Sequence, residues 1–208
     1  MISTRQELKF YIMEDRMMNR GFFRPSISER IKRFFVHDII MDYLVSLRYC
    51  AFYNNTNSII TLPIGYLFHA LRFRNLGIRL GFSIGYNSIG YGVTIPHYGT
   101  IVIGAENRIG NFAVFHTGIC ITGNKKVIGD AFYCSTGAKL TSEIRLGNNI
   151  SVTANSVVNR DCTQDNVLLA GAPATVIKDS PAWYVRDGAT FSNRVAKVLQ
   201  LKSEMNIL

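Results

Sequence analysis

The sequence lacks closely spaced cysteines and long hydrophobic runs, and each absence excludes a class of protein. No two of the four cysteines form a close pair, which excludes a zinc ribbon and a CxxC redox motif. The cysteines are Cys50, Cys120, Cys134 and Cys162. The longest apolar stretch, residues 59–71, is shorter than the roughly 20 residues of a membrane-spanning helix. No charged start followed by an apolar segment is present, so we expect a cytoplasmic protein with free thiols.

Acidic residues are also scarce, since 14 Asp and Glu stand against 23 Lys and Arg, for a formal net charge of +9. Such an excess suits nucleic acid, an anionic membrane surface or a polyanionic small molecule. The net charge is +6 over residues 1–80, +1 over 81–177 and +2 over 178–208. Because the central part is almost neutral, we expect no nucleic acid partner. These ranges are also the expected domains: a helical N-terminal domain, a repeat domain and a C-terminal extension.

The N-terminal domain is expected to begin with a helix. Residues 3–20 have a helical pattern, in which Ser3 with Gln6 forms a possible capping box and Gly21 is a plausible stop.

A second helix is expected to begin at Ser26, because Glu29 follows three residues later. Apolar residues then recur at spacings of three and four, which indicates one helical stripe that ends at Asn54. The stripe consists of Val36, Ile40, Leu44, Leu47 and Ala51. A third helix is expected over residues 62–76, with Gly77 near its end.

From Ile84 onwards, apolar anchor residues recur every six positions. The last six are in constant register and are Ile128, Cys134, Leu140, Leu146, Val152 and Val158. Earlier anchors, separated from these by a one-residue slip, are Ile89, Ile95, Ile101, Ile103, Ile109, Phe115 and Ile121. A helix would repeat at three and four and a strand at two, so a hexapeptide repeat describes the segment better.

A hexapeptide repeat suits a parallel β-helix, in which three flat sides complete one coil. Each anchor then points inward and stacks on its equivalent in the next coil. The corners need tight turns and positive φ, which Gly and Asn adopt most readily. Units such as 109–114, 128–133 and 146–151 have Gly directly after the anchor. Chance spacing in a Gly-rich β-sandwich is the alternative, and six anchors in register disfavour it.

The hexapeptides, followed by Ala170-Gly171-Ala172-Pro173-Ala174, resemble the left-handed β-helix acyltransferases. The segment Ile95–Gly104 is similar to the part of serine O-acetyltransferases where a His precedes a small-Thr-Gly and an aliphatic run. It resembles more closely the serine acetyltransferase-like O-acetyltransferases of capsule and exopolysaccharide gene clusters. The resemblance covers residues 80–187, about half of the chain, and implies a homotrimer with active sites between neighbouring subunits.

The resemblance implies that His97 is a general base. It would take the hydroxyl proton of the acceptor, which then attacks acetyl-CoA directly in a ternary complex. His116, one coil further along, would bind the acceptor or stabilise the oxyanion. A structural role in a turn is the alternative for both residues. His37 and His69 fall in the helical region and are expected to be packing or surface residues.

Acetyl-CoA is the donor that the resemblance implies. Four small residues would line the groove for its pantetheine arm: Gly123, Gly137, Ala138 and Ala154. Ala172 and Pro173 would approach the adenine, and Lys178 a phosphate. The alternatives are β-helix corners for the small residues and a solvated charge for Lys178. Only two His lie in the coils, so the three-His metal site of the γ-class carbonic anhydrases is not expected.

Two departures from the serine enzymes favour another acceptor. Pro96 stands where they have an Asp, and Ser83 falls near the position of the Asp that orients their His. Their loop with Arg-His, which helps to bind the serine carboxylate, is absent at residues 123–128. We therefore expect O-acetylation of a glycan or glycan precursor in surface polysaccharide biosynthesis. L-serine O-acetylation and a non-catalytic β-helix scaffold are the alternatives.

Two further expectations concern the ends of the chain. After Trp183, an apolar helical stripe in the C-terminal extension is expected to cap the open end of the β-helix. The basic N-terminal helices, together with the apolar segment 59–71, are expected to contact an anionic membrane or an acidic glycan. This would hold the enzyme at the inner face of the membrane.

Overall fold

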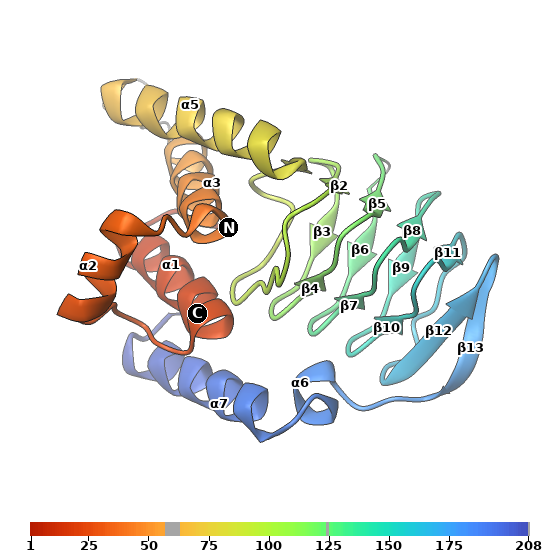
Figure 1. Ribbon diagram of the computed structural model, residues 1–208. Helices are drawn as coiled ribbons and strands as arrows, with labels where there is room; N and C mark the ends of the chain where they lie inside the picture. The colour runs from red at the N-terminus through yellow and green to blue at the C-terminus, as the bar shows by residue number, and fades with distance from the viewer. Residues whose placement is uncertain (57–62, 124, 208) are drawn as a thin grey trace.

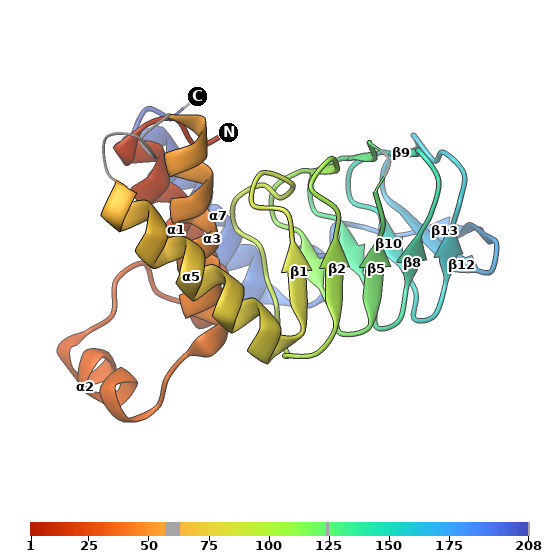
Figure 2. The same cartoon turned by 90° about the horizontal axis from the view of Figure 1, so that it is seen from above.

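The computed structural model describes residues 1–56, 63–123 and 125–207, apart from the side chains of residues 33 and 34. A bundle of N-terminal helices stands at one end of a stack of short parallel strands, and the chain's last helix returns to lie beside that bundle (Figure 1). Seen from above, the strands of successive coils lie side by side along the stack (Figure 2).

Helix α1 (Arg5–Arg20) begins two residues later than expected. Its N-cap is Thr4, whose hydroxyl accepts a hydrogen bond from the Glu7 amide at 3.1 Å. The Glu7 carboxylate accepts from the Thr4 amide in return, at 2.8 Å. The box predicted at Ser3 is therefore wrong by one position. The predicted stop is confirmed, because Gly21 ends the helix with a left-handed φ of 83°.

The single helix expected after Ser26 is in fact two helices, α2 (Ile27–Phe35) and α3 (Ile39–Asn55). Ser26 caps α2, as predicted. The chain is extended at Val36, and Asp38 then caps α3 by accepting a hydrogen bond from a first-turn amide. The prediction failed because the apolar spacing continues across the break.

Helix α5 (Pro63–Leu80) runs past its expected end at residue 76. Gly77 does not stop the helix. A Cβ at this position would lie 2.9 Å from the carbonyl oxygen of Phe82, so glycine allows the helix to approach the first strand closely. Leu62, the expected first residue of this helix, lies outside the described residues.

Three sheets form the faces of the β-helix. Sheet 1 contains β1 (Phe82–Ile84), β2 (Ile101–Ile103), β5 (Ile119–Ile121), β8 (Lys139–Leu140) and β11 (Val157–Val158). Sheet 2 contains β3 (Arg108–Ile109), β6 (Val127–Ile128) and β9 (Arg145–Leu146). Sheet 3 contains β4 (Val114–Phe115), β7 (Tyr133–Cys134), β10 (Ser151–Val152), β12 (Val167–Gly171) and β13 (Ala174–Asp179). The coil strands pair in parallel, and β13 returns antiparallel to β12, across the boundary expected at residue 177.

Every predicted anchor of the repeat is buried. Equivalent anchors stack one coil apart: Cys134 pairs with Val152, 18 residues later, whereas Phe115 pairs with Cys134, 19 residues later. The additional residue lies between Ile121 and Ile128, where the sequence period slips. The slip is thus an enlarged corner between sheets 1 and 2, and the core continues through it without a break.

The glycine that follows each anchor has a different role from the one predicted. A Cβ at Gly129 would lie 2.7 Å from the carbonyl oxygen of Gly147 in the next coil, so close coil packing requires glycine there. The positive φ angles fall two residues later, at Ala131 (55°) and Asn149 (56°). The corners therefore turn at those residues, while the glycines set the distance between coils.

Helices α3 and α5 close the N-terminal end of the β-helix. Tyr43 and Leu47 of α3 and Leu80 of α5 belong to the same buried cluster as the coil anchors. Helices and coils thus share one core.

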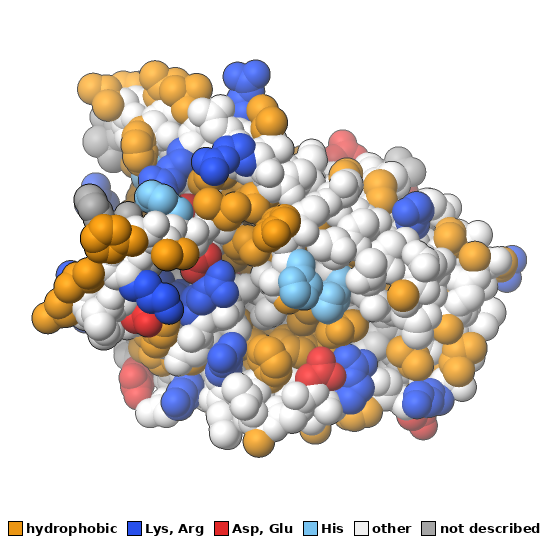
Figure 3. Space-filling view, in the orientation of Figure 1, with side chains coloured by type: hydrophobic (Ala, Val, Ile, Leu, Met, Phe, Trp, Pro, Cys, Tyr) orange, Lys and Arg blue, Asp and Glu red, His pale blue; other side chains and the backbone are white. Residues whose placement is uncertain are grey.

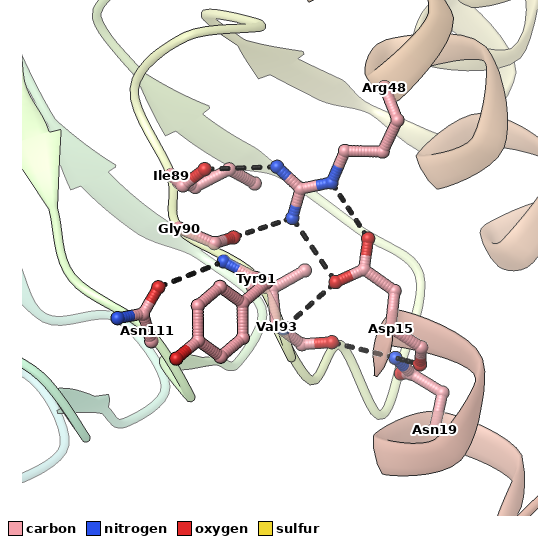
Figure 4. Close-up of polar contacts among 8 residues, drawn as sticks. All are labelled: Asp15, Asn19, Arg48, Ile89, Gly90, Tyr91, Val93 and Asn111. Carbon is pink, nitrogen blue, oxygen red and sulfur yellow. Dashed lines mark hydrogen bonds and ion pairs between the residues drawn. The ribbon is translucent and has the colours of Figure 1, made fainter. Parts of the chain in front are cut away.

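A buried ion pair joins α1 and α3 to the first coil (Figure 4). The Arg48 guanidinium donates to both carboxylate oxygens of Asp15, at 2.8 and 3.1 Å. It also donates to the carbonyl oxygens of Ile89 and Gly90, at 2.9 and 2.6 Å. Asp15 accepts a further hydrogen bond from the Val93 amide at 3.1 Å. Since both side chains are only 1% exposed, these bonds replace the water that the charges lose.

The C-terminal helices α6 (Trp183–Arg186) and α7 (Ala189–Glu204) do not cap the last coil, so that prediction is wrong. The indole N–H of Trp183 donates to the Phe112 carbonyl oxygen at 2.7 Å, which holds α6 against the side of the coils. Helix α7 continues back to α1, where Arg194 donates to a carbonyl oxygen at 2.7 Å (Figure 1). The hairpin of β12 and β13 lies next to the last coil instead.

Candidate active site

His97 and His116 lie on one corner of the β-helix, in loops stacked one coil apart. Each loop leads from sheet 3 to sheet 1, and the strands that follow them pair through Ile101 and Ile119. Two histidine side chains lie side by side over the coils in the space-filling view (Figure 3). We call this edge of the β-helix the histidine corner; it comprises residues 96–100, 116–118, 135–137 and 153–155.

The two histidines have different surroundings. His97 is exposed, whereas His116 is half-buried and its Nε2 lies 2.8 Å from the Tyr133 hydroxyl oxygen. Burial lowers the pKa of His116, the neighbouring His97 lowers it further, and Asp187 acts in the opposite direction. A lowered pKa keeps the His116 imidazole neutral at pH 7, where it can both donate and accept a hydrogen bond.

Groups from the C-terminal extension reach the same corner. The Arg186 guanidinium lies over the Tyr133 ring, 4.6 Å from its centroid. It donates to the Ser151 hydroxyl at 3.0 Å and to the Asp187 carboxylate at 2.7 Å. The sequence alone did not predict that Tyr133, Arg186 and Asp187 belong to this site. The polar run after Trp183 was visible in the sequence, but only the return of α6 along the coils brings it to the histidines.

The position expected for an orienting carboxylate is not beside His97. Ser83 pairs with Val102, beyond the His97 loop. That loop is fixed to the end of α5 instead, where the Gly99 amide donates to the Leu80 carbonyl oxygen at 3.0 Å.

The residues expected to hold the pantetheine arm are only partly brought together. Gly137 and Ala154 lie on the histidine corner, where the Gly137 amide donates to the Thr117 carbonyl oxygen of the preceding coil at 2.9 Å. Ala138 follows Gly137 and points into the core of the β-helix. Its side chain is 0% exposed, and its amide donates to the Ser135 carbonyl oxygen. A ligand on the outside of the coil does not reach that side chain.

Gly123 lies at a different corner, on the far side of β5. This is the enlarged corner, and Lys126 is buried within it. The Lys126 ammonium donates to the carbonyl oxygens of Thr122 and Gly123, at 3.0 and 2.7 Å. A Cβ at Gly123 would have no neighbour within 4 Å, so the surface is open there. The Lys126 side chain therefore stabilises the backbone of this enlarged corner.

The predicted adenine-end residues lie on the terminal hairpin. Ala172 and Pro173 form its exposed turn, next to which the Gly171 amide donates to the Ser156 hydroxyl at 3.1 Å. This bond holds the turn next to residues 153–155, the last loop of the histidine corner. Lys178 is exposed near the opposite end of β13, away from the turn.

The remaining histidines lie outside the coils, as expected. His37 is exposed in the link between α2 and α3. The His69 ring stacks on Tyr49, with ring centroids 3.9 Å apart. Within the described ranges, no three His, Cys, Asp or Glu residues are grouped so that they could hold a metal ion.

Comparison with known sequences gives a consistent family of relatives. No protein-family model matches the chain. The serine acetyltransferase of Staphylococcus aureus is 30% identical over 113 residues, which are 51% of this chain and 51% of that protein. The serine acetyltransferase of Synechococcus elongatus is 30% identical over 96 residues, 43% of this chain and 39% of that protein. The chain thus aligns with about half, or less, of the length of these curated relatives.

Comparison with solved structures shows the fold. The serine acetyltransferase of Brucella abortus strain S19 superposes with a TM-score of 0.61 at 18% identity, over 85% of this chain and 70% of that one. A serine acetyltransferase in complex with CoA gives 0.60 at 18% identity, over 82% and 68%. The expected left-handed β-helix with a helical N-terminal region is confirmed. The chain is therefore serine acetyltransferase-like, a hexapeptide-repeat β-helix protein with the fold of those enzymes.

Proposed function

We propose that the chain is an acetyl-CoA-dependent O-acetyltransferase with His97 as its general base. The observation that carries this proposal is an exposed histidine beside a half-buried neutral one on the same corner of a β-helix. A protein of the same fold has been solved in complex with CoA. His97 takes the acceptor's hydroxyl proton, the oxygen bonds to the acetyl carbon, and the thioester C–S bond breaks. The proton then passes from His97 to the departing CoA thiolate.

His116 is proposed to stabilise the oxyanion that forms during this attack, or to hold the acceptor beside it. Stabilisation requires a donor that is already oriented before the reaction. The Tyr133 hydroxyl meets Nε2 of His116, and Arg186 covers the Tyr133 ring, so this histidine is held by a tyrosine that is itself fixed.

We propose a glycan or glycan precursor of surface polysaccharide biosynthesis as the acceptor. The residue before His97 is Pro96, which has no carboxylate. The Lys126 ammonium is bound to a backbone carbonyl oxygen of its own corner. Free serine carries a carboxylate that needs a cationic partner in the site, whereas a sugar has no carboxylate to bind. Tyr98, next to His97, is 73% exposed, and its ring is proposed to contact the acceptor. The proposed assembly is a homotrimer in the cytoplasm, with the histidine corner of each subunit facing a neighbour.

L-serine is the second candidate acceptor. The observation in its favour is that the Staphylococcus aureus and Synechococcus elongatus relatives are both serine acetyltransferases. A mass-spectrometric screen of the full chain with acetyl-CoA, L-serine, nucleotide sugars and oligosaccharides separates the two candidates. Acetylated sugar without acetylserine supports the proposal, and robust acetylserine formation replaces it. No transfer to any hydroxyl, together with no CoA binding in calorimetry, identifies a non-catalytic scaffold.

Replacement of the proposed base tests the mechanism. His97→Ala is expected to lower the transfer rate by about 10²–10⁴, while circular dichroism and the unfolding midpoint stay unchanged because the side chain is exposed. His37→Ala is the matched control, since it removes an exposed histidine outside the coils. Near-normal turnover in folded His97→Ala protein would exclude His97 as the base.

A further inference from the structure

Helix α5 leaves an apolar face uncovered. Its buried residues lie near its C-terminal end, at Leu76, Gly77 and Leu80, where it packs on the first coil. Along its outer side, large apolar residues recur at helical spacing, from one end of the helix to the other. They are Ile64, Leu67, Phe68, Leu71 and Ile78. The first and last of these are 85% and 71% exposed, so this side of the helix has no cover within the chain as described.

Helix α2 adds a second uncovered apolar surface. Ile27 and Ile31 of α2 are 78% and 58% exposed, and Val36, directly after the helix, is 65% exposed. Helix α2 stands away from the rest of the chain (Figure 2). A cleft beside the α5 surface is lined by Phe68 and Leu71 of α5 and by His37 of the link that follows α2. Hydrophobic side chains gather over both helices in the space-filling view (Figure 3). We call the exposed apolar residues of α2 and α5 together the helical face.

The charge around the helical face is positive. Residues 63–80 contain three arginines and no Asp or Glu. Arg74 and Arg79 are exposed on α5, and Arg30 and Lys32 are exposed on α2. Asp42, which lies under α5, pairs with Arg72 at 2.8 Å, so its charge is already compensated. Exposed apolar side chains bordered by cations are the pattern of helices that lie on anionic membrane surfaces.

We propose that the helical face docks on the surface of an anionic lipid bilayer. Its apolar side chains enter the boundary between headgroups and acyl chains, and the arginines and lysine meet the lipid phosphates. Docking on a second copy of the chain is disfavoured, because it would bring two positive surfaces together. The proposal uses no residue of the histidine corner, so it stands independently of the proposed enzymatic activity.

None of the helices in the described ranges is long and apolar enough to cross a membrane.

Vesicle co-sedimentation of the full chain tests the proposal. The protein is expected to sediment with vesicles that contain phosphatidylglycerol and to stay in solution with phosphatidylcholine alone. Arg74→Gln with Arg79→Gln is expected to lower the partition coefficient roughly 25-fold, about fivefold for each charge removed. Leu67→Ser with Leu71→Ser is expected to abolish most of the binding. Val127→Ser and Arg160→Gln are matched controls, since they change exposed residues of the coils.

Two results would overturn the proposal. The first is equal sedimentation of the wild type and the arginine variant, provided that circular dichroism shows both to be folded. The second comes from light scattering: a smaller particle mass for the leucine variant, with no vesicle binding by the wild type, identifies a second copy as the occupant. All of these changes lie on exposed side chains, so acetyl transfer in solution is expected to persist in every variant.

Discussion

At the scale of single residues, the orientation of His116 depends on contacts that come from three parts of the chain. Its Nε2 meets the Tyr133 hydroxyl at 2.8 Å, one coil further along. The Tyr133 ring lies under Arg186, and Arg186 is fixed in turn by Ser151 and Asp187. Each contact restricts the next, so the proposed oxyanion donor is oriented before a substrate arrives. The pair of His116 and Tyr133 is therefore expected to act as one unit.

Tyr133→Phe tests this unit. It removes the hydroxyl and keeps the ring under Arg186, so we expect kcat to fall about tenfold or more while KM for acetyl-CoA stays the same. His116→Gln is expected to lower kcat further. The double variant should be no slower than His116→Gln alone, because the hydroxyl acts only through His116. Steady-state kinetics on the wild type, the two single variants and the double variant measure these changes in kcat and KM. Tyr66→Phe, on α5, is the control, and additive losses would show that the two residues act separately.

At the scale of elements, the β-helix is held at one corner by a repeated set of hydrogen bonds from backbone amides to side chains of the next coil. The Asp130 carboxylate accepts from the Asn111 amide at 2.7 Å, and Asn148 accepts from the Asp130 amide at 2.9 Å. Asp165 continues the series by accepting from the Asn148 amide at 2.6 Å. Such a ladder needs the coils to approach closely, and the glycines before Asn111, Asp130 and Asn148 permit it.

Gly129→Ala tests whether this spacing is required. The added Cβ would lie 2.5 Å from the Asn148 Oδ1 and 2.7 Å from the Gly147 carbonyl oxygen. Because the φ of Gly129 is not positive, the cost is steric, and we expect a loss of about 1–3 kcal/mol in the free energy of unfolding. Gly123→Ala is the matched control and is expected to be near neutral, since its Cβ would meet nothing within 4 Å. Urea denaturation compares them, and equal stabilities would refute the explanation.

The elements also show what a sequence of this kind predicts well. Every predicted anchor is buried, because a side chain that points inward at every sixth residue is a local property, and the sequence period reports it directly. The same stacking brings His97 and His116 to one corner. The break between α2 and α3 was missed, since apolar spacing continues across it and only the Asp38 cap marks it. Arg186 was missed because the surface on which a helix packs is decided by tertiary contacts, here by Trp183.

At the scale of the whole molecule, the helices and the coils form one structural unit. The buried cluster that begins in α3 continues through the coils to β12. A second cluster joins α1 and α7 to the side of the coils at Tyr91 and Phe112. The ion pair of Asp15 and Arg48 lies between them and reaches the backbone of the first coil. Because these contacts cross the boundary between helices and β-helix, we expect a single cooperative unfolding transition.

Arg48→Met tests this coupling. It leaves the Asp15 carboxylate buried without its cation, so we expect a loss of about 3–5 kcal/mol in the free energy of unfolding. The double variant with Asp15→Asn should lose less than the sum of the single losses, because neither charge then remains unpaired. Arg20→Met is the control: its pair with Asp38 is partly exposed, and we expect at most about 1 kcal/mol. Urea denaturation followed by both tryptophan fluorescence and circular dichroism measures all four. If Arg48→Met cost no more than Arg20→Met, the helices would not depend on this buried link to the coils.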